Sequence, residues 1–193
     1  ENVEPHPELA RAILDTIGIA PDRPILLGGS THPGEEEVLA RIFQQLRQDF
    51  PALFLIIAPR HAERARVVAA QLRTAGLTTR RRSEAASAFP GDCLLLDTTG
   101  ELRDWYSVAT IVFIGKSLTA RGGQNPVEAI VAGRPVIFGP HMENFAALAR
   151  VLVAAGGALQ PNDEVVLKTI VADLLRDPAK RERLARNAHQ VLN

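Results

Sequence analysis

The chain has 193 residues, a length that fits one domain comfortably. Its 22 basic and 22 acidic side chains cancel, so binding of nucleic acid or an anionic membrane through bulk charge is not expected, and any anion recognition must be local. With 46% hydrophobic residues, the chain can bury a sizeable core without a metal or a disulfide.

Cysteine content and hydropathy narrow the class further. Cys93 is the only cysteine, which rules out a disulfide framework and favours a reducing compartment. It lies in an apolar run, where a small buried hydrophobic residue is expected. No apolar stretch has the length of a transmembrane helix. The acidic, polar start is unlike a signal peptide and resembles a linker at a domain boundary.

Helical patterns and short apolar runs alternate along the chain. In chain order, they predict a helix at 9–17, a strand at 24–28, a helix at 35–49, a strand at 53–58, a helix at 62–75, strands at 77–81 and 93–97, a helix at 102–109, a strand at 110–115, a helix at 127–132, a strand at 135–139, a helix at 144–154, a strand at 158–160, and helices at 163–175 and 179–191. Most strand runs are continuous, which is typical of parallel strands covered on both faces. The alternation predicts an α/β fold with a doubly wound, mostly parallel, Rossmann-like sheet.

In such a sheet, ligands bind outside the carboxyl ends of the strands. The strand at 24–28 runs into the loop 28–37, which contains Gly28, Gly29, Ser30 and Thr31. Its glycines would let backbone N–H groups approach a ligand, and the two hydroxyls would add donors. Pro33 and the three glutamates at 35–37 are equally consistent with a well-capped helix, and these glutamates speak against a phosphate directly over that helix end.

Two further loops follow apolar runs. Pro59 and Arg60 come directly after 53–58, and an arginine there can reach a phosphate or a base edge, although it would also suit the start of an exposed helix. In the loop 97–102, Thr98 and Glu101 have the spacing of a capping box, which is a sufficient structural explanation. The backbone of the same loop could also face a flat base.

The loop 115–129 is the most informative. Asn125 as N-cap, Pro126 and Glu128 form a capping arrangement at a helix start. A carboxylate at this point can also accept hydrogen bonds from both hydroxyls of a ribose, and Gly122 and Gly123 would leave space for a sugar or phosphate. A functional role is favoured because one loop gathers several polar side chains: Lys116, Ser117, Thr119, Arg121 and Gln124.

These loops, in this order, resemble the C-terminal domain of the bacterial 3-deoxy-D-manno-octulosonic acid (Kdo) transferases. The matching segments are 29–36 (GSTHPGEE), 59–64 (PRHAER), 97–102 (DTTGEL), 122–128 (GGQNPVE) and 139–145 (GPH and NF), and the resemblance runs from residue 23 to the C-terminus. Each segment is weak by itself, but five in register form a specific signal.

The resemblance implies the C-terminal half of a GT-B glycosyltransferase, in which two Rossmann-like domains enclose the active site. Residues 1–22 would be a linker and leading helix, and residues 23–193 the donor-binding domain. The full-length protein would move Kdo from CMP-Kdo to a lipid A precursor during lipopolysaccharide biosynthesis, without a metal or cofactor. It would act at the cytoplasmic face of the bacterial inner membrane, with membrane contact only through an N-terminal part that this chain lacks.

The matching motifs imply donor contacts at Pro59, Arg60, Gly100, Glu101, Leu102, Asn125, Pro126, Val127 and Glu128. Ser30 and Thr31 would lie near the donor phosphate and Ser117 near the sugar. The family's general base is a glutamate of the N-terminal domain, so no catalytic residue is assigned here. The isolated chain is expected to be soluble and to bind CMP without catalysis. Lys116 and Gln124 depart from glycine and histidine of many members, so the nucleotide is better defined than the sugar.

Three alternatives remain open. A GT-B transferase or an epimerase acting on a UDP-sugar would share the fold and differ in the nucleotide. A dinucleotide-dependent dehydrogenase is disfavoured, because the chain lacks both GxGxxG and a ribose-binding acid after the second strand. A non-catalytic nucleotide-binding or interaction module is the third alternative. An interaction module would show no stabilisation by a nucleotide in a melting experiment.

Overall fold

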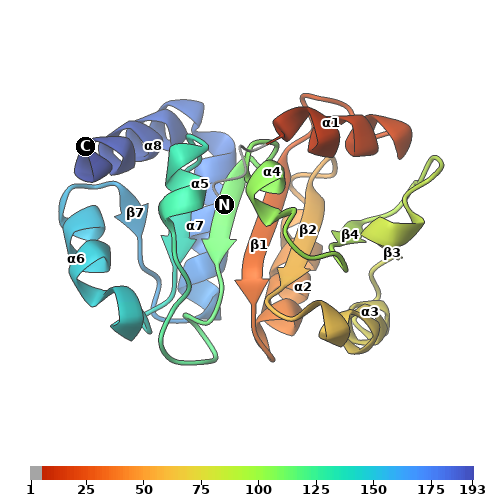
Figure 1. The fold of residues 1–193 in the computed structure, drawn as a ribbon, viewed down its shortest axis with the longest axis horizontal. Coiled ribbons are helices and arrows are strands. Elements are labelled where there is room, and N and C mark those ends of the chain that lie inside the picture. Colours follow the sequence, from red (N-terminus) through yellow and green to blue (C-terminus); the bar gives the residue numbers. More distant parts are fainter. Residues whose placement is uncertain (1–5) are drawn as a thin grey trace.

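The computed structural model describes residues 6–193, and seven strands of this part form one sheet (Figure 1). The strands are β1 (Ile25–Thr31), β2 (Phe54–Pro59), β3 (Thr79–Arg81), β4 (Cys93–Leu95), β5 (Ile111–Ile114), β6 (Val136–Phe138) and β7 (Ala158–Leu159). Their order is β3-β4-β2-β1-β5-β6-β7, and every neighbouring pair is parallel. The predicted doubly wound parallel sheet is confirmed.

Helices cover both faces of this sheet. They are α1 (Pro7–Thr16), α2 (Glu35–Leu46), α3 (Ala65–Thr74), α4 (Leu102–Tyr106), α5 (Val127–Val131), α6 (Ala146–Ala154), α7 (Glu164–Arg176) and α8 (Pro178–Leu192), with 3-10 turns at Ala62–Arg64, Arg82–Glu84 and Glu143–Phe145. One apolar core lies under α1, α4, α5 and α6, and a second lies under α2, α3 and α7. In Figure 1, α4 and α5 stand in front of the sheet and α2 and α7 behind it.

The continuous apolar runs became strands because both of their faces are covered. Every residue of β2 is buried. Cys93 is 0% exposed in β4, and burial raises the pKa of its thiol, so the predicted buried role is confirmed. The leading helix α1 belongs to the same packing, since Ala10 and Leu14 lie in the first core. No helix within residues 6–193 is long and apolar enough to cross a membrane.

Helix ends follow local chemistry at the C-terminal part of the chain. Asp163 caps α7 by accepting a hydrogen bond from the Val166 N–H at 2.9 Å. Asp177 caps α8 in the same way through the Lys180 N–H at 2.9 Å, with Pro178 in the first turn. Such caps fix where each helix starts and therefore how it returns across the sheet.

The first strand is longer than predicted, and this corrects the role expected for its glycines. Gly28 and Gly29 lie inside β1 rather than in a ligand-binding turn. A Cβ atom at Gly28 would stand 2.5 Å from Cδ1 of Leu39, and one at Gly29 would stand 2.7 Å from the Tyr106 hydroxyl oxygen. The glycines therefore let α2 and α4 pack closely against the central strand.

Candidate functional site

The carboxyl ends of β1 and β2 and the segment after β4 enclose a small cleft, called here the strand-end cleft, of about 100 Å³. It is lined by Ser30, Ala58, Pro59, Arg60, Ala62, Leu96, Thr98, Thr99, Gly100, Glu101 and Leu102. Half of the predicted site residues meet here: Ser30, Pro59, Arg60, Gly100, Glu101 and Leu102. Loops from three strands thus converge at one edge of the sheet, as expected for a doubly wound fold.

Arg60 is the cationic group of the strand-end cleft. Its backbone N–H donates to the Thr31 carbonyl at 3.0 Å, which fixes the start of the loop beside β1. Its side chain is exposed, and its guanidinium has no acceptor among residues 6–193. His61 follows Arg60 directly, and its ring centroid lies 6.3 Å from that of His32, which follows β1. A guanidinium with free N–H groups at a cleft mouth is suited to bind a phosphate.

Glu101 is held in place by Arg82, from the 3-10 turn after β3, and by Thr98. Its carboxylate accepts hydrogen bonds from Arg82 at 3.1 and 3.4 Å and from the Thr98 hydroxyl at 2.9 Å. The predicted capping box is therefore wrong, because Thr98 and Glu101 bond through their side chains and Glu101 itself stands at the N-cap of α4. With its carboxylate engaged, this segment offers its backbone to a ligand.

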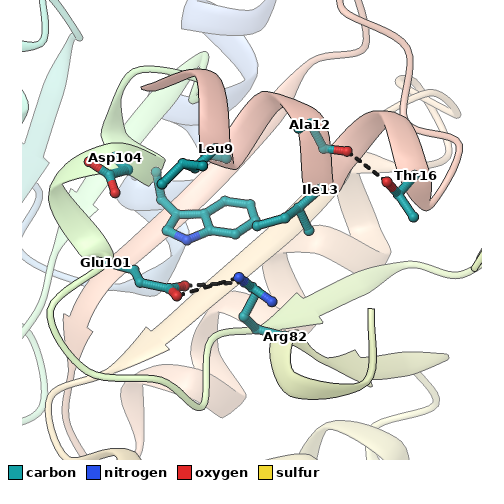
Figure 2. A pocket seen from close by; sticks show the side chains of 9 residues that line it. Leu9, Ala12, Ile13, Thr16, Arg82, Glu101 and Asp104 are labelled. Atoms are coloured by element: carbon teal, nitrogen blue, oxygen red, sulfur yellow. Dashed lines mark hydrogen bonds and ion pairs between the residues drawn. The ribbon is translucent and has the colours of Figure 1, made fainter. Parts of the chain in front are cut away.

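A second hollow shares Glu101 with the strand-end cleft. Its lining is drawn in Figure 2. This α1 pocket has a volume of about 240 Å³ and is lined by Leu9, Ala10, Ala12, Ile13, Thr16, Arg82, Glu101, Asp104 and Trp105. Figure 2 shows the Arg82–Glu101 pair facing Leu9 and Ile13 of α1. Glu101 thus lines both hollows, whereas its partner Arg82 lines only the α1 pocket.

Glu128 lies outside the strand-end cleft. It lines a hollow of about 510 Å³ between α4 and α5, together with Pro7, Arg103, Ser107, Val127, Val131 and Ala132. Its carboxylate accepts hydrogen bonds from Arg103 at 2.9 and 3.3 Å, and 43% of the side chain remains exposed. The two regions are neighbours along α4, since Leu102 lines the cleft and Arg103 lines this hollow.

The segment before α5 behaves as predicted at Asn125. Its side-chain oxygen accepts a hydrogen bond from the Val127 N–H at 3.0 Å. Pro126 is buried directly before the helix, which begins at Val127, one residue later than the N-cap prediction requires. Asn125 is exposed, so it can still contact a ligand lying over the helix start.

Two of the predicted hydroxyls are turned into the protein. Thr31 and Ser117 are both 0% exposed. The Thr31 hydroxyl donates to Glu36 at 2.9 Å, and the Ser117 hydroxyl donates to the Ile114 carbonyl and accepts from the Gly139 N–H at 2.8 Å. Both side chains hold loops together in this structure, so the expectation that they reach a phosphate or a sugar has no geometric support.

Glu35 organises the site, and the sequence reasoning missed this role. Its carboxylate is 0% exposed and accepts four backbone hydrogen bonds, from the N–H groups of His32, Lys116, Ser117 and Leu118, at 2.9 to 3.0 Å. It therefore joins the loop after β1 to the loop after β5. A glutamate in a first helical turn suggests only a dipole contact, so no sequence signal distinguished it.

The glycine pair also has a different role from the one predicted. Gly122 and Gly123 are buried and have φ values of 115° and 74°. A Cβ atom at Gly122 would stand 2.8 Å from Nδ2 of Asn144, and one at Gly123 would stand 2.5 Å from Sδ of Met142. These glycines allow a left-handed turn to pack against the segment after β6, and they do not leave open space for a sugar.

Within residues 6–193, no group of three or more histidine, cysteine, aspartate or glutamate side chains is arranged to hold a metal ion. No protein-family model matches the chain. Curated relatives do match it: a 3-deoxy-D-manno-octulosonic acid transferase of Haemophilus influenzae is 38% identical over 175 residues, 89% of this chain and 40% of that protein. One of Bordetella pertussis is 39% identical over 88% of the chain and 41% of that protein. The chain spans about two fifths of these relatives' length.

Solved structures define the class of the domain. The C-terminal domain of a glycosyl transferase group 1 family protein from Francisella tularensis superposes with a TM-score of 0.65 at 14% identity, covering 97% of this chain and 92% of that one. The fold is that of a GT-B glycosyltransferase C-terminal domain. The C-terminal CMP-Kdo binding domain of WaaA from Acinetobacter baumannii superposes with a TM-score of 0.86 at 27% identity, covering 97% of both chains. By sequence and structure together, the chain belongs to the Kdo transferase family and corresponds to its C-terminal domain.

Proposed function

We propose that this chain is the donor-binding part of an enzyme that transfers Kdo from CMP-Kdo to a lipid A precursor. The relatives are Kdo transferases, and the WaaA domain of A. baumannii is described as binding CMP-Kdo. The strand-end cleft is the observation that supports this proposal for the present chain, because Arg60 and residues 98–102 line it together.

Arg60 is proposed to bind the phosphate of the donor. When the glycosidic bond breaks, CMP leaves and its phosphate gains negative charge. A guanidinium fixed beside that phosphate stabilises the charge as it develops, and no resident metal or cofactor is needed for this step. Ser30, on β1 beside Arg60, would add a hydroxyl donor from the floor of the cleft.

The cytidine is proposed to lie against the backbone of Gly100, Glu101 and Leu102. Arg82 and Thr98 occupy the Glu101 carboxylate, so the loop presents fixed peptide groups instead of a free acid. Asn125, Pro126, Val127 and Glu128 would contact the ribose from α5, with the Glu128 carboxylate accepting its hydroxyls in place of part of the Arg103 contact.

The cleft is too small to hold the donor alone. Small-molecule sites usually have volumes of about 300 Å³ or more, whereas the strand-end cleft measures about 100 Å³. We propose that an N-terminal domain of the same protein covers the remaining surface and supplies the general base, the acceptor site and the contact with the cytoplasmic face of the inner membrane. Closure of the two domains would exclude water from the sugar.

Calorimetric titration of this chain with CMP, UMP and ADP tests the proposal. CMP should bind at least about tenfold more tightly than UMP and ADP, a difference of about 1.4 kcal/mol. A preference for UMP would support a UDP-sugar enzyme, and a preference for ADP would point to a different nucleotide class. Absence of binding and of thermal stabilisation by every nucleotide would support an interaction module. A preference for UMP, a preference for ADP, or the absence of binding would each refute the proposal.

Arg60→Ala separates the phosphate contact from the rest of the site. A charge-assisted hydrogen bond contributes about 1.5–3 kcal/mol, so CMP affinity should fall about tenfold or more while cytidine affinity stays unchanged. Arg66→Ala is the matched control, because Arg66 is an exposed arginine of α3 outside the cleft. Equal losses for CMP and cytidine would contradict the assignment of Arg60 to the phosphate.

A further inference from the structure

Lys116 has a backbone conformation that lysine rarely adopts. Its φ is 55°, in the left-handed region, which costs a residue with a side chain about 1–2 kcal/mol relative to the usual conformation. The backbone is clamped from both sides: its N–H donates to Glu35 at 2.9 Å, and its carbonyl accepts from the Gly123 N–H at 2.8 Å. The fold therefore imposes this conformation, and glycine would adopt it without strain.

The ammonium of Lys116 has no counterion in the described part of the chain. The side chain is half-buried and runs along the glycine turn, with its Cε 3.4 Å from the position of a Cβ at Gly122. The neighbouring carboxylates are already occupied: Glu35 by four backbone N–H groups, and Glu143 by the Gly122 N–H, Arg121 and His141. A partly buried cation without a partner is costly, and an anionic ligand would offset that cost.

Lys116 stands across the central strand from Arg60. β1 pairs with β2 on one side and with β5 on the other. Gly115, directly before Lys116, packs so closely against the end of β1 that a Cβ there would stand 2.2 Å from the Ser30 carbonyl oxygen. Ser30 also lines the strand-end cleft with Arg60. β2 and β5 flank β1, so the two strands lie two spacings, or about 9.6 Å, apart. The long side chains of arginine and lysine can bridge that separation to one ligand with two anionic groups.

We infer that Lys116 binds the carboxylate of an acidic sugar on the donor, while Arg60 binds the phosphate. The inference rests on the proposed function and goes further by assigning the group that selects the sugar. In a glycosyl nucleotide of a 2-ulosonic acid, the carboxylate and the phosphate are attached to the same carbon, so the two anions lie close together. Two unpaired cations on either side of β1 match that arrangement. A neutral sugar would leave Lys116 without a partner, and the site would bind it more weakly.

The test compares CMP and CMP-Kdo as ligands of this chain by calorimetry, with three variants of Lys116. Lys116→Met removes the charge and keeps the length of the side chain, Lys116→Arg keeps the charge, and Lys116→Gly also removes the backbone strain. Lys180→Met is the matched control, because Lys180 lies in the first turn of α8 and lines none of the hollows described above. Thermal melting of each variant reports whether it folds.

Wild type should bind CMP-Kdo more tightly than CMP. Lys116→Met and Lys116→Gly should weaken CMP-Kdo about tenfold, or about 1.4 kcal/mol, and CMP less than threefold, whereas Lys116→Arg and Lys180→Met should change neither by more than threefold. Equal losses for both ligands would assign Lys116 to the phosphate and overturn the inference, as would no loss for either. If wild type binds neither ligand, the proposed function itself fails, which is a distinct result.

Discussion

Replacing Glu35 with glutamine tests whether one buried carboxylate holds the site together. In the native chain, Oε1 accepts from the Ser117 and Leu118 N–H groups, and Oε2 accepts from those of His32 and Lys116. A glutamine amide has one oxygen and one NH₂ group. In either orientation, its NH₂ group faces two N–H donors, so two of the four hydrogen bonds are lost and two buried donors are left unpaired.

The expected cost follows from those two bonds. Hydrogen bonds to a charged group contribute about 1.5–3 kcal/mol each, so Glu35→Gln should lower the free energy of unfolding by about 3–6 kcal/mol. For a domain of this size, the melting temperature should fall by roughly 6–24 °C. Urea denaturation followed by circular dichroism measures the free energy of unfolding. Hydrogen exchange should also show that the amides of Ser117 and Leu118 lose protection.

Glu37→Gln is the matched control for this experiment. Glu37 lies in the same first turn of α2, so it shares the interaction with the helix dipole, but its buried Oε2 has no hydrogen-bond partner in the described structure. Its replacement should change stability by less than about 1 kcal/mol. Equal effects of the two substitutions would mean that Glu35 acts only through the dipole. If Glu35→Gln lowers the free energy of unfolding by less than about 1 kcal/mol, the Glu35 carboxylate does not hold the two loops together.

Three further substitutions test other contacts of the site. Arg82→Gln removes the arginine partner of the Glu101 carboxylate, so CMP binding should weaken about threefold and the preference for CMP over UMP should fall. The free energy of unfolding should drop by less than about 1 kcal/mol. Arg81→Gln is the control, because it breaks the adjacent exposed pair with Glu84 and should leave CMP binding unchanged. Ser117→Ala removes two buried hydrogen bonds, so urea denaturation should show about 1–3 kcal/mol of destabilisation while calorimetry shows unchanged CMP affinity; a loss confined to binding would instead favour a ligand contact. Glu128→Ala should lower CMP affinity about tenfold. Its melting temperature should stay within about 4 °C of wild type, because the exposed pair of Glu128 with Arg103 contributes little to stability. Unfolding of this variant would favour a purely structural role for Glu128.

Strand positions were predictable because continuous apolar runs have few alternatives in a soluble chain. The runs that became β2 and β5 are buried along their whole length, and parallel pairing follows from that burial. Parallel strands also end at a common edge, so the convergence of Pro59, Arg60 and the segment at 100–102 could be expected before any coordinates. These parts of the prediction depended on patterns that a sequence shows directly.

Side-chain direction in the loops was not predictable, because residue type does not fix it. Ser30 was expected near the donor phosphate and Ser117 near the sugar, but Ser30 lines the cleft and Ser117 is buried. The Arg82–Glu101 contact joins segments 19 residues apart in sequence. It depends on β3 pairing with β4, a register that short strands do not specify strongly. Glu35 was missed for the related reason that three of its four partners are backbone N–H groups of a loop 81 to 83 residues away.

The carboxylates near the carboxyl ends of the strands are paired within the protein, which explains how a chain without net charge could bind an anion there. Glu35 is occupied by backbone N–H groups, Glu36 by Arg64 and Thr31, and Glu101 by Arg82. Each acid is used within the protein to hold a loop, and none of these is left to repel a ligand. The side-chain cations of Arg60 and Lys116, by contrast, have no acceptor within residues 6–193. Internal pairing of the acids therefore leaves local positive charge at the strand ends, where a nucleotide sugar carrying a phosphate would bind.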